Sequence, residues 1–565
     1  MNRAVIAALF LLPGALSAAE PGERWIRFDT PEFELFTSAP EREGRDLLAR
    51  FEQIRAFFLK ASPVPLLEQF PIRIVAFGAK DQFRPYSPIA QNVAYATSSR
   101  RTDYIVMQDA EPTSYRFAVH EYMHLLVKHS GLRLPVWLNE GWAEVYSTMR
   151  PVRGGVAVGD LAPERVRDLA SAPLLDFHTL TSVTEHSPKY STGIFYAESW
   201  ALVHMLFLSP EYAENFPKFL VAIHRGASAE EACGEAWGKS PAEIITDLRS
   251  YLDRKKLYGR VFETPLGKAE GGAVVSKVDE FDSRLMLADL KATIGQRREA
   301  EADYEDLTAM QPGNPRLAES LGYFRWSTHD LAGAREYFEK AYAAGDADPR
   351  MCFELSLLER DAHQPDKSIA ALERAIRSEP RYGDALLQLG LMRVAAGQYR
   401  TAIESLMSVR KVTPVQATPL FSALAYAYFE TGNLEKARDA ALTAKRWALL
   451  QKEASGVDSL LAIIDARSKS PFAPRPDEKV SRAEGTLQEI ECSSGSNRLA
   501  ILAGQTKMVF ELPDAQAIEF VNPGGNPAVK LTCGPQTATW VVVEYAPASV
   551  MRAGPVGVVR RLEFR

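Results

Sequence analysis

The sequence predicts a multidomain chain with a mixed α+β domain, an all-α repeat solenoid and a small all-β C-terminal domain. Three observations predict this fold class. Strand-like and helix-like patterns mix over residues 20–260, small residues recur with a period of 34 over 283–468, and a segment rich in Val, Thr, Gly and Pro covers 482–565. A proline-rich stretch at 470–476 separates the last two regions.

Length and composition restrict the class of protein. The chain has 565 residues, of which 46% are hydrophobic and 24% charged. These values are typical of globular proteins and exclude collagen-like chains and polytopic membrane proteins. The chain has 66 Lys and Arg and 72 Asp and Glu. Because there is no excess of basic residues, we expect no nucleic-acid partner. Four cysteines in 565 residues are too few for a disulfide-rich scaffold.

Residues 1–19 have the pattern of a secretory signal peptide. Arg3 precedes an apolar run from Ala4 to Leu12, and the small residues Ser17 and Ala19 follow, which is the layout of a cleavable leader. The apolar run is much shorter than the ~20 residues that cross a bilayer. We therefore expect an exported bacterial protein, periplasmic or secreted, without stable membrane insertion.

Short strands are predicted early in the mixed domain. The segments Pro71–Phe77, Asn92–Ala96 and Tyr104–Gln108 are rich in β-branched and aromatic residues, which favours extended structure. Longer amphipathic segments follow them, so the domain should combine a sheet with helices.

The segment His120-Glu121-Tyr122-Met123-His124 is an HExxH motif inside one of these amphipathic segments. On a helix that Gly131 can end, His120 and His124 lie one turn apart and point the same way, as two imidazoles that share a zinc ion must. Glu121 projects beside them, where a carboxylate can take a proton from metal-bound water. The motif predicts Zn²⁺ as the cofactor.

A second helix, predicted from Pro135 onward, supplies further carboxylates. Glu140 and Glu144 lie four residues apart and share one face. Catalytic zinc keeps three protein ligands, and Glu140 is the expected third ligand. Glu144 is expected to accept a hydrogen bond from the distal nitrogen of His120 and so to fix its tautomer. The alternative for Glu144 is a solvated surface carboxylate.

The sequence HEYMH at 120–124, followed by WLNEGWAEVY at 137–146, resembles the gluzincin metallopeptidases. It is most similar to peptidase MA-like domains and to the catalytic core of aminopeptidase N-type enzymes. The resemblance implies a zincin-like catalytic domain over 20–260, with Glu140 as the third zinc ligand. It also implies that Tyr196, which opens the segment YAESWALVHML, stabilises the oxyanion. The alternative for Tyr196 is an ordinary helix tyrosine, and Tyr190 is the reserve candidate.

One departure from the family concerns specificity. Aminopeptidase N-type enzymes carry a GxMEN-type sequence whose glutamate holds the free amino terminus of the substrate, and nothing like it precedes His120. The segment at 92–97 could pair with an extended peptide as an edge strand but has no carboxylate. An endopeptidase is therefore expected rather than an aminopeptidase.

The central region is a repeat array. Small residues stand at Ala288, Gly322, Ser356, Gly390 and Ala425, at spacings of 34, 34, 34 and 35. A second series with the same spacings begins twelve residues later and consists of Ala300, Ala334, Ser368, Ala402 and Ala437. Small residues where two helices approach, with bulky ones between the repeats, resemble tetratricopeptide repeats. We expect a protein partner on this array and a capping helix over 455–468.

The C-terminal region predicts strands over 499–502, 507–512 and 539–545. Cys492 and Cys533 lie in similar contexts. In an exported protein they can form a disulfide, and the alternative is two buried thiols.

Two functions follow from these patterns. The first is an exported zinc-dependent peptidase that hydrolyses a peptide or protein substrate and recruits proteins through its repeats. The second is a catalytically inert exported repeat scaffold in which the zincin-like domain is structural.

Overall fold

The computed structural model describes residues 24–565 apart from 62–65, 67–69, 90–91, 153–154, 255–256, 264–271, 449–450, 470–478, 494–495, 514–517, 522–531 and 549–554. The leader expected over 1–19 and the proline-rich stretch at 470–476 lie outside these residues. The described chain divides into two compact units, and the boundary between them in the sequence lies between Gln364 and Pro365. This boundary falls inside the repeat array, because the first repeats pack with the N-terminal sheet.

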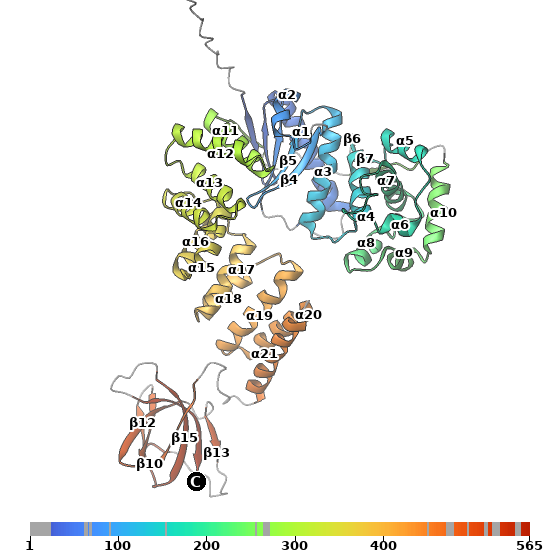
Figure 1. Cartoon of the computed structure of the whole chain (residues 1–565). Helices are drawn as coiled ribbons and strands as arrows, with labels where there is room; N and C mark the ends of the chain where they lie inside the picture. Colours follow the sequence, from blue (N-terminus) through green and yellow to red (C-terminus); the bar gives the residue numbers. More distant parts are fainter. Residues whose placement is uncertain are drawn as a thin grey trace, which may run out of the picture. The chain divides into compact units, whose positions relative to one another are not determined.

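A mixed sheet forms the centre of the first unit (Figure 1). Its strand order is β4-β5-β3-β2-β1-β9. β2, β3 and β5 are parallel, whereas β4, β1 and β9 run antiparallel to their neighbours. Among the described strands, β4 therefore forms one edge. The strands are β1 (Ile26–Asp29), β2 (Phe33–Thr37), β3 (Ile72–Ala76), β4 (Ala94–Ser98), β5 (Asp103–Met107) and β9 (Val274–Lys277).

The strands predicted from composition correspond to β3, β4 and β5, with ends that differ by one to two residues. β9 lies beyond residue 260, where the sequence placed the end of the domain, and it pairs with β1 through the register Ile26↔Lys277. The sheet therefore extends the N-terminal domain as far as Lys277.

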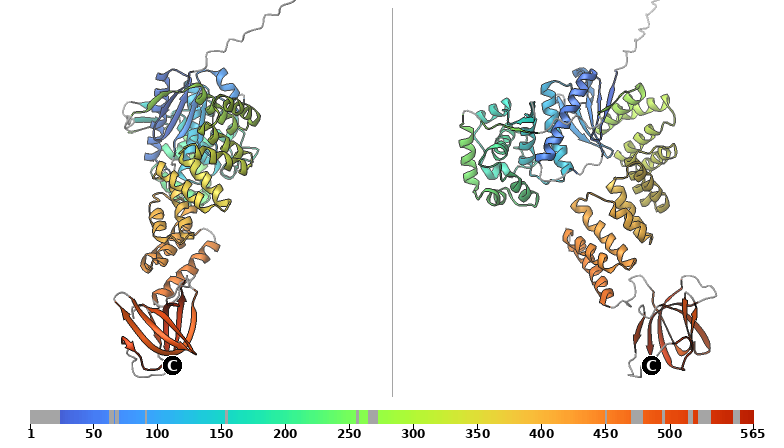
Figure 2. Two further views of the ribbon diagram at one scale, coloured as in Figure 1. Left: turned by 90° about the vertical axis from the view of Figure 1, so that its left-hand side faces the viewer. Right: turned by 180° about the vertical axis from the view of Figure 1, so that it is seen from behind.

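Helices cover both faces of the sheet (Figures 1 and 2). α1 (Glu41–Ala61) and α3 (Pro112–Ser130) pack on one face, where Ile74 and Ile105 belong to the main core. α11 (Glu280–Thr293) packs on the other face, where its Leu290 joins a second core of strand residues. The first repeat helix thus serves as a layer of the N-terminal domain.

A helical layer follows α3 along the chain. Its central helix, α7 (Gly193–Leu208), has apolar residues all round and is almost entirely buried, as expected for a helix enclosed by others. α4 (Val136–Ser147) packs against both α3 and α7. The remaining elements of the unit outside the repeats are α2 (Lys80–Phe83), η1 (Arg84–Tyr86), α5 (Pro163–Ser171), α6 (Phe177–Thr181), α8 (Phe216–His224), α9 (Ala229–Trp237), α10 (Pro241–Leu252) and the small antiparallel sheet β6 (Arg150–Val152), β7 (Gly155–Val158) and β8 (Arg260–Phe262).

The repeat array consists of helix pairs, as the 34-residue period predicts. Its small residues lie where helices approach: a Cβ on Gly322 would collide with the ring of Phe338, and one on Gly390 with the side chain of Leu406. After α11 the helices are α12 (Arg297–Met310), α13 (Pro315–Ser327), α14 (Leu331–Ala343) and α15 (Pro349–Asp361) in the first unit. In the second unit they are α16 (Pro365–Ser378), α17 (Gly383–Ala395), α18 (Tyr399–Met407), α19 (Pro414–Glu430) and α20 (Leu434–Trp447). α21 (Gln451–Lys469) packs on α20 and α19 and is the expected capping helix.

The C-terminal domain is all β, as predicted. Its strand order is β11-β12-β16-β15-β10-β14, with β13 paired to β16. A disulfide bond joins Cys492 and Cys533, which decides between the two alternatives for these cysteines. The strands are β10 (Ser481–Ser493), β11 (Ser496–Ala503), β12 (Thr506–Leu512), β13 (Glu519–Val521), β14 (Gly534–Pro535), β15 (Trp540–Pro547) and β16 (Gly557–Phe564).

Candidate metal centre

α3 and α4 bring His120, His124 and Glu140 together. The Nε2 atoms of the two histidines lie 3.2 Å apart. Oε2 of Glu140 lies 3.3 Å from Nε2 of His120 and 3.6 Å from Nε2 of His124. Among the described residues, these three form the one group of His, Cys, Asp and Glu side chains whose ligand atoms converge in this way.

Local sequence explains how the third residue reaches the two histidines. α4 starts directly after Pro135, and its one glycine, Gly141, faces α7. A Cβ at Gly141 would collide with the backbone carbonyl of Ser199. Glycine therefore lets α4 lie directly on α7 with Glu140 turned toward α3.

The charges in this group stabilise one another. Burial on its own raises the pKa of Glu140, but hydrogen bonds and charge interactions with His120 and His124 outweigh burial and hold that pKa well below its usual range. Burial lowers the pKa of His124, whereas Glu140 raises it, and the net pKa is raised. The carboxylate is thus held ionised, as a metal ligand must be.

The spacing of the three atoms fits a zinc ion. A tetrahedral ion with bonds of about 2.0–2.1 Å holds its ligand atoms about 3.3–3.4 Å apart. The three separations here, 3.2, 3.3 and 3.6 Å, are close to that value. Two imidazole nitrogens and one carboxylate oxygen are also a donor set that zinc prefers. Side chains of His120 and His124 are 13% and 23% exposed, so solvent reaches the group.

Glu121 lies beside the edge strand. Its Oε2 accepts a hydrogen bond from the backbone N–H of Ala96 in β4, at 3.2 Å. This N–H therefore points away from β5, and alternate residues of an antiparallel strand direct their backbone groups to the same side. The outward backbone groups of Ala94, Ala96 and Ser98 thus form a short open edge at which Glu121 lies.

Glu144 lies behind His120, where the sequence placed it. Its Oε1 is 3.5 Å from Nδ1 of His120, the ring nitrogen that faces away from the group. Glu144 is 3% exposed and is therefore not a solvated surface carboxylate. Its charge is balanced by Arg165, whose Nη2 lies 2.6 Å from Oε1, and by Arg116 at 3.5 Å from Oε2.

The two candidate tyrosines lie together at the start of α7. The hydroxyl of Tyr190 donates a hydrogen bond to Oε1 of Glu140, at 3.1 Å. The ring of Tyr196 is 5.8 Å from that of Tyr190 and packs under the guanidinium of Arg165 at 5.1 Å. Burial and then the charge of Glu140 raise the pKa of both hydroxyls, so both remain protonated donors at neutral pH. Tyr190, the reserve candidate, makes the direct contact.

Sequence reasoning missed Arg116 and Arg165. Arg116 lies one helical turn before His120, and this spacing was a usable signal, since residues four apart on a helix are neighbours. Arg165 reaches Glu144 from α5, and no motif or spacing in the sequence indicates such a long-range contact.

Comparison with known proteins identifies the repeats. The sequence model of the tetratricopeptide repeat family matches residues 285–349 and 353–409. The array therefore consists of tetratricopeptide repeats, which form surfaces for protein interaction. No curated protein matches the chain.

Several solved structures are similar to part of the chain. YrrB, a "TPR protein with an unusual peptide-binding site", is 20% identical, with 31% of this chain and 90% of that chain covered and a TM-score of 0.28. MamA is 20% identical, with 35% and 98% covered and a TM-score of 0.26. PilW, a type IV pilus biogenesis factor, is 19% identical, with 35% and 96% covered and a TM-score of 0.24.

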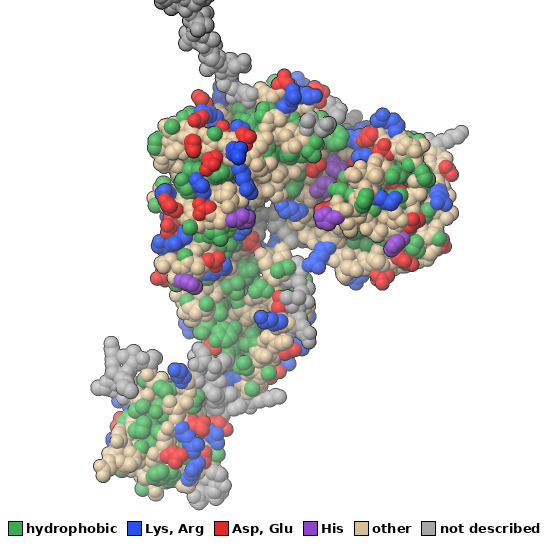
Figure 3. All heavy atoms as spheres, in the orientation of Figure 1, with side chains coloured by type: hydrophobic (Ala, Val, Ile, Leu, Met, Phe, Trp, Pro, Cys, Tyr) green, Lys and Arg blue, Asp and Glu red, His purple; other side chains and the backbone are tan. Residues whose placement is uncertain are grey.

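Two properties of the surface and the helices bear on partners. On the face of the first unit seen in Figure 3, positive and negative side chains are interspersed. Within the described part of the chain, no helix combines the length and the apolar character that crossing a bilayer requires.

Proposed function

We propose that the protein is an exported, zinc-dependent peptidase of the gluzincin type, with a zincin-like catalytic domain and a repeat array that recruits proteins. One observation carries the proposal: His120, His124 and Glu140 present three ligand atoms at the mutual distances that a tetrahedral zinc ion requires. The resemblance of HEYMH and WLNEGWAEVY to gluzincins supports the same assignment.

Zinc at this position would polarise the carbonyl of the scissile bond and lower the pKa of a water molecule. The carboxylate of Glu121 then acts as the general base, taking a proton from the attacking water and passing it to the leaving amine. Its hydrogen bond to the Ala96 N–H holds it at the edge of β4.

The surrounding residues orient this machinery. Oε1 of Glu144, 3.5 Å from Nδ1 of His120, favours the tautomer that carries its proton on Nδ1 and leaves Nε2 for the ion, and Arg165 holds Glu144 in place at 2.6 Å. Tyr196 supplies a hydroxyl to the negative charge that develops on the substrate oxygen. Tyr190 orients the carboxylate of Glu140 through its hydrogen bond to Oε1.

The open edge of β4 is suited to an extended peptide. The outward backbone groups of Ala94 and Ser98, together with the C=O of Ala96, can pair with a substrate strand, which gives affinity without dependence on side chains. The N–H of Ala96 binds Glu121. No carboxylate in β4 stands where a free amino terminus would need one, since the strand reads Ala-Tyr-Ala-Thr-Ser. The proposed enzyme is therefore an endopeptidase.

Digestion of an unbiased peptide library by purified protein tests the proposal. The wild type should cleave peptides internally, in a manner that chelation abolishes and zinc restores. Glu121→Gln should cleave none of them while it keeps its zinc, and Glu185→Gln, the same change at an exposed glutamate, should match the wild type. A library that stays intact with the zinc-loaded wild type would favour an inert scaffold instead.

A further inference from the structure

The repeats hold the tip of the β4–β5 hairpin, residues 99–102. Arg101 projects from this tip into the array, where its side chain is 13% exposed. Its Nη1 lies 3.0 Å from Oδ2 of Asp289 in α11, and its Nη2 lies 2.8 Å from Oε2 of Glu319 in α13. Ser320 accepts a further bond from Nη1 at 3.3 Å. Burial lowers the pKa of Arg101, but the carboxylates of Glu319 and Asp289 outweigh burial and raise it well above its usual value.

The neighbouring arginine adds contacts from the second and third repeats. Nε of Arg100 lies 2.8 Å from Glu354 in α15, and its guanidinium stacks on Trp326 of α13 at 4.3 Å. Arg350, also in α15, donates to the backbone carbonyl of Arg101 at 3.4 Å. The first helices of three successive repeats thus hold two residues of the N-terminal domain, Arg100 and Arg101.

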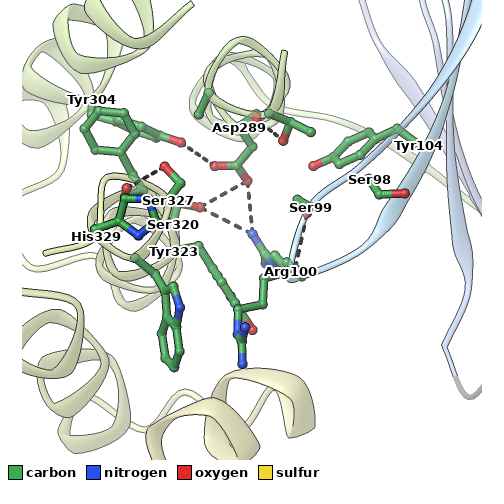
Figure 4. A pocket seen from close by; sticks show the side chains of 15 residues that line it. Ser98, Ser99, Arg100, Tyr104, Asp289, Tyr304, Ser320, Tyr323, Ser327 and His329 are labelled. Atoms are coloured by element: carbon green, nitrogen blue, oxygen red, sulfur yellow. Dashed lines mark hydrogen bonds and ion pairs between the residues drawn. The ribbon is translucent and has the colours of Figure 1, made fainter. Parts of the chain in front are cut away.

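Figure 4 shows this region, with Arg100, Asp289 and Ser320 around a cavity of about 380 Å³. The cavity lies beside the tip of the hairpin, so the tip itself is held by ion pairs and hydrogen bonds rather than by close apolar packing. Apolar packing holds the strands behind the tip, where Leu290 of α11 joins Tyr95 and Tyr104 in one core. Removing one partner of a buried pair leaves an uncompensated charge, and for this reason such pairs hold a segment in one position.

The held segment is continuous with the proposed substrate-binding edge. β4 is five residues long, and among the described strands it pairs with β5 alone. Ala96, whose N–H bonds to Glu121, stands three residues before Ser99 at the tip. A shift of the tip therefore displaces the outward backbone groups of Ala94, Ala96 and Ser98 relative to Glu121.

We propose that Arg100 and Arg101 are positioning residues, through which the first three repeats set the place of β4 and thereby the binding of the peptide substrate. This inference rests on the proposed function. It gives these repeats a role inside the substrate-binding framework, in addition to the recruitment of a partner.

The first test replaces Arg100, because its side chain is 46% exposed and its loss should leave the fold intact. Arg100→Ala should raise KM about tenfold for a peptide that the wild type cleaves, with a smaller fall in kcat, since β4 binds the substrate before and during reaction and also holds Glu121 through Ala96. Arg42→Ala, at an exposed arginine of α1, is the matched control and should leave both constants unchanged. Arg101→Lys keeps the positive charge but loses the planar guanidinium that binds two partners at once. It should raise KM more than Arg100→Ala does.

A second readout does not depend on catalysis. Amide hydrogen exchange of β4 should be at least about tenfold faster in Arg100→Ala than in the wild type, whereas exchange of α7 should be unchanged. If the arginines served stability alone, the variants would contain fewer active molecules and show a lower kcat at unchanged KM. That result, or unchanged exchange of β4, would overturn the inference. A wild type that cleaves no peptide would refute the proposed function, and the exchange of β4 would still decide whether the repeats position the strand.

Discussion

The hydroxyl of Tyr190 donates a hydrogen bond to Oε1 of Glu140, at 3.1 Å, whereas Oε2 of the same carboxylate faces the two histidines. The two oxygens of one ligand therefore have separate tasks. Tyr190 fixes the orientation of the carboxylate, and Oε2 is left for the ion. Tyr196, which the sequence favoured, makes no such contact among the hydrogen bonds of the described residues and remains the proposed donor to the substrate.

Replacing the two tyrosines should consequently have different effects, one on zinc affinity and the other on kcat. Tyr190→Phe should weaken zinc binding about 10–100-fold, as the loss of an outer-shell partner does. Tyr196→Phe should leave zinc affinity unchanged and lower kcat about 10²–10³-fold, as the loss of an oxyanion donor does. Zinc competition with a chelating dye and steady-state kinetics measure the two effects. Equal zinc affinity in Tyr190→Phe and wild type would refute the division of tasks.

Gly141 should tolerate no side chain. In Gly141→Ala the new methyl group meets the carbonyl of Ser199, which is backbone and cannot rotate away. We expect a loss of about 1–3 kcal/mol in the free energy of unfolding and weaker zinc binding, because α4 must move and Glu140 with it. Urea unfolding measures the first effect. The control is Gly234→Ala in α9, where a Cβ meets nothing within 4 Å and alanine should be neutral or stabilising by up to about 1 kcal/mol. Equal losses in both variants would contradict this reading of α4.

The buried carboxyl of Glu198 should make stability depend on pH. Its Oε2 accepts the N–H of Leu175 at 2.7 Å, and burial raises its pKa from 4.5 to about 7. The folded state binds this proton more tightly than the unfolded state does, so protonation of Glu198 stabilises the fold. This stabilisation is complete below pH 4.5 and is lost as the pH rises through 7. Glu198→Gln keeps the acceptor without the charge, so its stability relative to wild type should improve by about 1–3 kcal/mol between pH 5 and pH 8. Thermal unfolding at the two pH values checks this, and a difference that is the same at both would be the contrary result.

The disulfide should stabilise the C-terminal domain independently of the metal centre. Cys492 and Cys533 are 41 residues apart. Closing a loop of that length lowers the entropy of the unfolded chain and so raises its free energy by about 4 kcal/mol. Reduction, or replacement of both cysteines by serine, should lower the unfolding midpoint of this domain in urea. Zinc content should not change. An identical midpoint in the presence and absence of reductant would contradict the expectation.

Much of the architecture could be predicted because it depends on residues that recur at regular spacings along the sequence. The 34-residue spacing of small residues indicated the helix pairs, and Gly322 facing Phe338 shows the physical cause of that spacing. The four-residue spacing of His120 and His124 likewise placed both imidazoles on one helix face. Glu144 behind His120 followed from the same helical geometry.

Contacts between distant segments could not be predicted in this way. β9 joins the sheet from beyond residue 260, and its four residues carry too little apolar pattern to be recognised. Arg165 reaches Glu144 across 21 residues, and Arg101 reaches Glu319 across 218. Charged side chains in loops and helices are usually solvated, so nothing in their composition distinguishes these two from the rest.

Whether His120, His124 and Glu140 bind zinc is measured by elemental analysis of the purified chain after preparation without chelators. We expect one zinc per wild-type chain, close to one in Glu121→Gln, and loss of the metal in His124→Ala and Glu140→Ala. A folded wild type that holds no zinc, even after incubation with the metal, would refute the zinc site and the peptidase activity proposed on it.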